Sequence, residues 1–135
     1  MTEAELSNSF CKSQSSWIFS EVSVGSKKIF GENSTNRAID LVLIQGSHPG
    51  KHYNYRDHKD LFLQLIHDVK NVITLVEVKK KLNRNVIGQI LVAEFMFKKK
   101  FKVKKLKKSI LYHIGDDALE LFCKQNQIDL FNLHN

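Results

Sequence analysis

The chain has 135 residues, of which 42% are hydrophobic and 26% charged, and its formal net charge is +7. This length and apolar content indicate one folded domain over 1–135 and exclude a disordered chain. No apolar run is long enough to span a membrane, and the first residues lack the basic and apolar pattern of a secretory signal. We therefore expect a cytoplasmic protein with no membrane partner.

The positive charge is concentrated in one segment. Eight of the eleven residues from Lys98 to Lys108 are Lys. Such a segment attracts polyanions, and the release of counterions makes that binding sensitive to salt. It is equally typical of a solvated surface. The segment becomes informative only if a candidate catalytic site lies elsewhere in the chain.

The first third of the chain predicts one helix followed by two strands. Thr2 and Glu5 have the spacing of a capping box, and the segments after them are rich in β-branched and aromatic residues. We expect a helix over Glu3–Ser13, a strand over Trp17–Val24, a turn-rich stretch over Gly25–Asn36 in which Lys28–Phe30 can extend a hairpin, and a strand over Arg37–Gln45.

The rest of the chain alternates between helical and extended patterns after an insertion at about 46–70. We expect a polar loop over Gly46–Asp57, helices over Asp60–Lys70, Asn85–Phe97 and from Asp116 or Asp117 to about Asn126, and strands over Val72–Lys79, Lys107–Ile114 and Ile128–Leu133. This order predicts an α/β protein (α+β by a stricter definition) with a mixed central sheet flanked by helices, whose last strand–helix–strand unit is parallel.

Three polar residues interrupt otherwise apolar strands. Asp40 lies between Ile39 and Leu41, and Glu77 and Lys79 end the apolar run that starts at Ile73. Side chains two positions apart on a strand project from the same face, so Glu77 and Lys79 are neighbours. A buried unpaired charge is costly, and an exposed ion pair contributes little. We therefore interpret these three residues as a catalytic group rather than as solvent-exposed polar side chains.

Two convergent carboxylates suit a hard divalent cation, Mg²⁺ or Mn²⁺. Mg²⁺ prefers oxygen ligands and needs only one or two protein carboxylates when water and phosphate oxygens complete its shell. We expect Asp40 and Glu77 as ligands, with the backbone carbonyl of Val78 as a third. Lys79 would orient the attacking water or stabilise the charge that develops on phosphorus.

The order of these residues resembles the PD-(D/E)xK nuclease superfamily, in which an acid ending one strand is followed by Glu-x-Lys on the next. Here the pattern is Ile39-Asp40, then Glu77-Val78-Lys79, then a helix that contains Ile87-Gly88-Gln89. A Gln after the signature strand is typical of the RecB-like and archaeal Holliday-junction-resolvase branches. The resemblance implies a restriction-endonuclease-like fold over nearly the whole chain.

The resemblance also implies further site residues. Gln89 would face the site, and an acid from the first helix would join it, with Glu5 favoured and Glu3 or Glu21 as alternatives. Basic residues after the signature and in the Lys-rich segment would contact the phosphate backbone without reading sequence. These nucleic-acid-binding candidates are Lys80, Lys81, Arg84, Lys98, Lys99, Lys100 and Lys102.

Together these features predict a metal-dependent endonuclease that acts on duplex or branched DNA, and the resemblance adds a homodimer. Two alternatives stay open, a catalytically silent nucleic-acid-binding module and a subunit that needs a partner for recognition. The sequence does not decide whether the substrate is DNA or RNA, or whether the enzyme is an endonuclease or an exonuclease.

Overall fold

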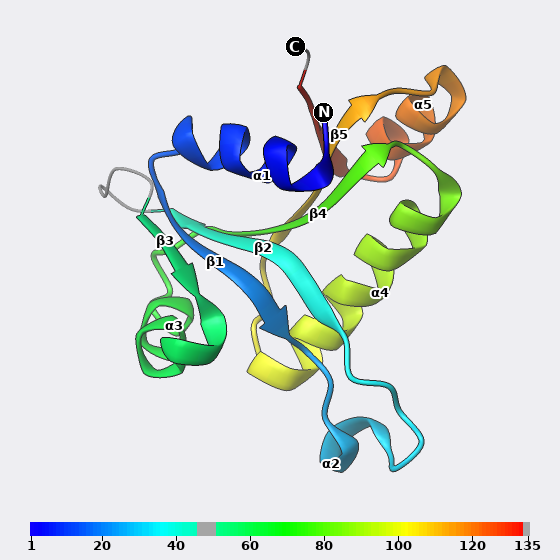
Figure 1. Cartoon of the computed structure of the whole chain (residues 1–135). Helices are drawn as coiled ribbons and strands as arrows, with labels where there is room; N and C mark the ends of the chain where they lie inside the picture. The colour runs from blue at the N-terminus through cyan, green and yellow to red at the C-terminus, as the bar shows by residue number, and fades with distance from the viewer. Residues whose placement is uncertain (46–50, 134–135) are drawn as a thin grey trace.

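The computed structural model describes residues 1–45 and 51–133, and Figure 1 shows how their helices and strands are arranged. One six-stranded mixed sheet forms the centre, with strand order β3-β1-β2-β4-β5-β6. The strands are β1 (Ser16–Ser23), β2 (Ala38–Gln45), β3 (Lys51–Asn54), β4 (Ile73–Lys81), β5 (Lys107–Ile114) and β6 (Ile128–Asn132). The protein is therefore of the mixed α/β class, as the sequence predicts.

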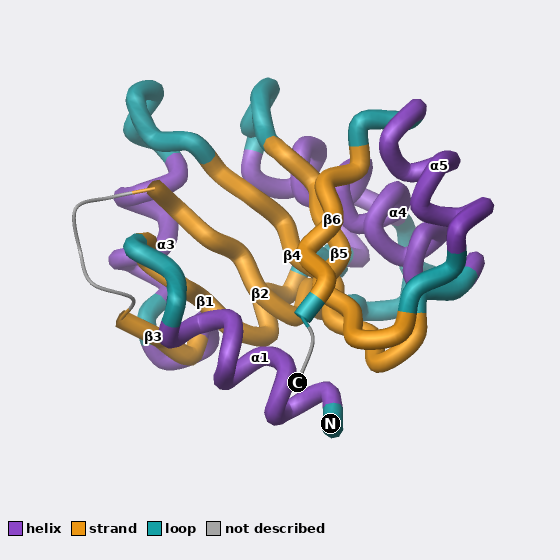
Figure 2. Tube along the Cα trace, turned by 90° about the horizontal axis from the view of Figure 1, so that it is seen from above, coloured by secondary structure: helices purple, strands orange, loops and turns teal. Residues whose placement is uncertain are grey.

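Helices cover both faces of this sheet. In Figures 1 and 2, α1 lies over one face and α4 over the other, while α2 lies beyond the end of β1. The helices are α1 (Glu3–Lys12), α2 (Lys27–Phe30), α3 (Lys59–Ile66), α4 (Arg84–Phe101) and α5 (Asp117–Gln125), and a 3-10 turn, η1 (Tyr55–Asp57), precedes α3. No helix in the described ranges is long and apolar enough to cross a membrane.

Alternating side chains of the strands fill two separate cores. On the α4 face, strand residues such as Phe19, Val42 and Leu75 pack with α3 and α4. On the α1 face, residues such as Leu41 and Val76 pack with Leu6 and Phe10 of α1. Because β2 and β4 are buried on both faces, any polar side chain on them must find a partner inside the protein.

Two short elements differ from the sequence predictions. Residues 51–54, predicted as loop, form the edge strand β3, which pairs parallel with β1, and residues 46–50 of that predicted loop lie outside the described residues. The Tyr53 ring stacks on Trp17 and Phe19 at 5.8 and 5.5 Å, so contacts from a distant strand override a polar local pattern. Residues 27–30 form α2 rather than part of a hairpin.

Two helices also end at different residues. The predicted helix over 60–70 ends at Ile66, because Asp68 starts a turn in which its carboxylate accepts the Lys70 amide, and Val69 is 97% exposed. By contrast, α4 continues to Phe101 through Lys98–Lys100. Lysine is a good helix former, and positive charge is favourable in the last turn of a helix.

The two cysteines are buried in different cores. Cys11 belongs to the α1 core and Cys123 to the α4 core, so the sheet separates them. Both are free thiols, and burial raises the pKa of each.

Candidate active site

The candidate site lies where β2 and β4 stop pairing. These antiparallel strands pair regularly from Ile44↔Ile73 to Leu41↔Val76. Continuing this register would place the Ile39 carbonyl opposite the Val78 amide. Instead, the Val78 amide donates to Asp40 Oδ2 at 2.8 Å. A side-chain carboxylate therefore replaces a backbone carbonyl, and the two strands separate at this point, which we call the open end.

A second irregularity on β1 accompanies the first. Glu21 has a φ of 54°, and the register between β1 and β2 places it opposite Asp40. Phe19 and Val22, three positions apart, both face the α4 core, so the alternation of side chains shifts by one at Glu21. A residue other than glycine in this conformation costs about 1–3 kcal/mol. The break leaves Glu21 and Asp40 outside both cores.

Asp40 and Glu77 interact directly at the open end. Glu77 is only 7% exposed. Burial, followed by the negative charge of Asp40 and a hydrogen bond to its carboxylate, raises the pKa of Glu77 to about 8. Burial also raises the pKa of Asp40, although the Val78 amide and the positive charge of Lys79 oppose the rise. Two carboxylates held this close carry one proton between them near neutral pH.

The remaining signature residues lie beside this pair. Lys79 is half-buried on the face that Glu77 shares, and its charge acts on Asp40. The amide and carbonyl of one strand residue point toward the same neighbouring strand. Because the Val78 amide points at Asp40, its carbonyl also points into the open end. The structure therefore brings together Asp40, Glu77, Val78 and Lys79.

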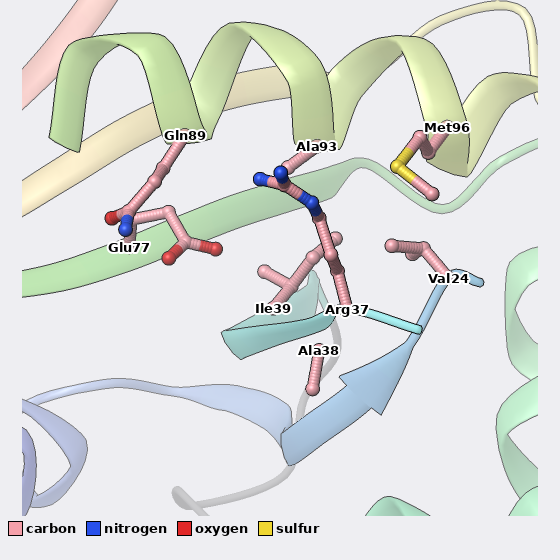
Figure 3. A pocket seen from close by; sticks show the side chains of 8 residues that line it. All are labelled: Val24, Arg37, Ala38, Ile39, Glu77, Gln89, Ala93 and Met96. Atoms are coloured by element: carbon pink, nitrogen blue, oxygen red, sulfur yellow. The ribbon is translucent and has the colours of Figure 1, made fainter. Parts of the chain in front are cut away.

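A pocket of about 190 Å³ opens beside Glu77, between the start of β2 and the underside of α4. Figure 3 shows Gln89 reaching from α4 toward Glu77, and Arg37 rising from the start of β2 toward α4. The pocket is smaller than those that hold drug-sized ligands, which start at about 300 Å³. A pocket of this size can hold a few water molecules or a phosphate group.

Arg37 is a site residue that the sequence analysis missed. Its carbonyl accepts the Val24 amide at 2.8 Å, and the chain between them folds back so closely that a Cβ on Gly25 would lie 2.6 Å from the Asn36 Cα. This turn fixes where Arg37 enters the pocket. In the described part of the chain, no carboxylate pairs with its guanidinium. The sequence feature that could have identified Arg37 is its position three residues before Asp40.

The donor set fits a hard divalent cation. The open end offers two carboxylates and one carbonyl, all oxygen donors. Within residues 1–45 and 51–133, no three His, Cys, Asp or Glu side chains converge as a metal-binding group. Mg²⁺ needs only one or two protein carboxylates when water and phosphate oxygens complete its shell, so the pair at the open end is chemically compatible with it.

Glu5, the favoured acid from the first helix, has a different structural role from the alternatives Glu3 and Glu21. The Glu5 carboxylate accepts the Thr2 amide in the capping box of α1, which is a structural role. Glu3 lies nearer the open end, because its carboxylate accepts the Lys80 amide at 3.3 Å and its charge acts on Asp40. The Glu21 side chain is largely exposed, and partial desolvation of its carboxyl together with the negative charge of Asp40 raises its pKa. Glu3 and Glu21, rather than Glu5, therefore accompany the pair.

The predicted basic contacts divide into two groups at opposite ends of α4. Lys80, Lys81 and Arg84 are exposed next to the open end, at the end of β4 and the start of α4. The Lys-rich segment begins on the last turn of α4, about 20 Å further along at 1.5 Å per residue. The candidates Lys98, Lys99, Lys100 and Lys102 therefore do not surround the acids.

Two lysines of the second group have structural partners. Lys100 donates to the Ser23 carbonyl at 2.8 Å, and burial lowers its pKa. Lys98 pairs with Glu94 at 3.8 Å, and Lys108 contacts the same carboxylate at 3.2 Å. Their charges still contribute to the positive field, but Lys100 is held against the protein rather than presented to solvent.

Comparison of the chain with models of protein families, with curated proteins and with solved structures finds no match. The function therefore has to be inferred from the geometry of the open end.

Proposed function

We propose that the chain is a divalent-metal-dependent nuclease of the PD-(D/E)xK superfamily, with a restriction-endonuclease-like fold, that hydrolyses phosphodiester bonds in duplex or branched DNA. One observation carries the proposal: the buried Glu77 carboxyl is held against the half-buried Asp40 carboxylate where the sheet opens into a small pocket, with Lys79 and Gln89 beside them. This arrangement destabilises the isolated protein, so we attribute it to function.

Each residue has a role in this proposal. Asp40 and Glu77 would hold Mg²⁺ or Mn²⁺ together with the Val78 carbonyl. A metal held there would lower the pKa of a bound water and neutralise charge on the phosphate. Lys79 orients the attacking water, and Gln89 holds either that water or the Lys79 ammonium. Lys80, Lys81 and Arg84 contact the backbone of the substrate. Homodimerisation and a cytoplasmic location stay predictions.

A catalytically silent nucleic-acid-binding module is the second candidate. The observation in its favour is that the two carboxyls are hydrogen-bonded to each other and Asp40 also accepts the Val78 amide, so no cation is needed to satisfy them. It predicts binding to DNA with no cleavage under any metal. The two candidates are separated by a single assay.

The test is cleavage of a supercoiled plasmid and a four-way junction with Mg²⁺, Mn²⁺ or EDTA. We expect metal-dependent cleavage that falls at least about 100-fold in Asp40→Asn, Asp40→Ala and Lys79→Ala. Asp40→Asn keeps an oxygen that can accept the Val78 amide, so its fold is preserved. Matched controls are Asp129→Ala and Lys124→Ala, which change exposed residues of β6 and α5. Binding without cleavage by the wild type would favour the silent module.

A further inference from the structure

A second pocket, of about 250 Å³, adjoins the first. Arg37 and Met96 line both, so the two pockets share a wall. The first has Glu77 and Gln89 on its other side, whereas the second is lined by Phe30, Thr35, Val92 and Phe95. We call the second one the side pocket. Its continuity with the acids suggests that one ligand occupies both.

Two phenylalanines distant in the sequence form the apolar wall of the side pocket. The rings of Phe30 on α2 and Phe95 on α4 lie 6.3 Å apart with their planes at 44°. Phe95 is 57% exposed, although it is part of a helix whose opposite face fills the core. An exposed aromatic residue at the rim of a pocket offers a flat apolar surface to a ligand.

Positive charge flanks this wall on both sides. The Lys99 ammonium lies 6.0 Å from the centre of the Phe95 ring, and Arg37 stands between the side pocket and the acids. A guanidinium binds phosphate oxygens in a bidentate manner and also stacks on planar groups. Aromatic faces with cations along the backbone path are how proteins hold unpaired nucleotides.

We propose that the side pocket binds an unpaired nucleobase of the substrate, adjacent to the phosphate held at the acids, with Arg37 contacting that phosphate. This inference rests on the proposed nuclease function and narrows its substrate. A base inside a duplex enters a pocket only after it is unpaired and unstacked, which costs free energy. The preferred substrate is therefore a strand that is single, flapped, mismatched or branched at the cleaved bond.

The test compares Phe95→Ala with the wild type in EDTA, where nothing is cut. Binding of a short single-stranded DNA and of the duplex with its complement is measured by fluorescence anisotropy at one salt concentration. We expect Phe95→Ala to weaken single-stranded binding at least about fivefold, the lower bound for one base–aromatic stack. Duplex affinity stays unchanged, and Phe95→Tyr restores single-stranded binding.

Two controls separate a base pocket from a general effect. Phe122→Ala removes a comparably exposed ring, 43% exposed, on α5 and leaves both affinities unchanged. A 2-aminopurine base in the single strand reports stacking directly, since its fluorescence changes on contact with an aromatic ring. That change is present with the wild type and lost with Phe95→Ala. Equal loss for single strand and duplex, or no loss for either, overturns the proposal.

Cleavage assays keep this inference distinct from the proposed function. With Mg²⁺, the wild type is expected to cut a mismatched or flapped substrate faster than a matched duplex, and Phe95→Ala to remove that preference. If the wild type cuts but Phe95→Ala leaves the preference intact, the base pocket is wrong and the nuclease stands. If the wild type never cuts but the Phe95-dependent binding persists, the base pocket stands and the nuclease is wrong.

Discussion

The two ends of the β2–β4 pair are built from the same strands but differ in kind. At one end, which we call the closed end, Ile44 pairs with Ile73 and the next amide, of Gln45, continues the ladder to the Val72 carbonyl at 3.0 Å. At the open end the ladder is broken by Asp40, whose half-buried carboxylate faces the buried carboxyl of Glu77. One strand pair therefore supplies stability at one end and a reactive group at the other.

The largest expected contrast is in how substitutions at the two ends change stability. Ile44→Ala removes a fully buried side chain and should destabilise the protein by about 2–5 kcal/mol. Glu77→Gln keeps the size of the side chain but removes its charge, so it should stabilise the metal-free protein by about 1–3 kcal/mol at pH 9. Urea unfolding measures both.

The pH dependence fixes the sign of the Glu77 effect. Its pKa rises from 4.5 to about 8 on folding, so between these values the folded state binds a proton that the unfolded state has lost. The contribution of Glu77 to the stability of the wild type therefore falls as pH rises from about 4.5 to about 8, and the advantage of Glu77→Gln grows over the same range. A Glu77→Gln protein no more stable than the wild type at pH 9 would contradict a charged carboxyl held at the open end.

The next largest expected effect is the stabilisation of the folded protein by bound metal. Mg²⁺ at about ten times its Kd should stabilise the wild type by about 1.4 kcal/mol, which raises the Tm by about 4–6 °C for a chain of this length. Asp40→Asn and Glu77→Gln should show no such rise. Thermal melts at pH 8 with MgCl₂, matched in ionic strength with NaCl, separate binding from screening. Equal protection of all three proteins would place the metal elsewhere.

The smallest effect concerns the left-handed residues. Glu21 and Gln127 have φ of 54° and 59°, and glycine adopts this region without strain, so Glu21→Gly and Gln127→Gly should each stabilise by about 0.5–1 kcal/mol. Only Glu21 faces Asp40, so only Glu21→Gly should also change the Mg²⁺ concentration needed for protection. If Glu21→Gly and Gln127→Gly change the required Mg²⁺ concentration equally, the Glu21 conformation does not affect metal binding at the acids.

Residues whose roles are set within a few positions could be predicted from the sequence. The apolar runs of β2 and β4 give central strands, and their polar interruptions at Asp40 and Glu77 mark the open end. The capping box of Thr2 and Glu5 is also local and is present in α1. That same local pattern explains why Glu5, expected from the resemblance to join the site, has another partner.

Features that depend on distant contacts could not be predicted. β3 forms because Tyr53 stacks on β1, and Arg37 lines the pocket beside Glu77 only because its loop folds back on Gly25. The side pocket requires Phe30 and Phe95 to meet across two helices. The Lys-rich segment looked like one unit in the sequence, but helix geometry carries it away from the open end and fixes Lys100 to Ser23.

The placement of the two thiols lets the local opening of each layer of the protein be measured separately. Cys11 is sealed beneath α1 and Cys123 beneath the opposite layer, so a thiol reagent reaches each one only when its own layer opens. The rate of modification at each sulfur therefore reports how often one layer opens, independently of the other. Ligand-induced tightening near α4 would slow the labelling of Cys123 while leaving that of Cys11 untouched.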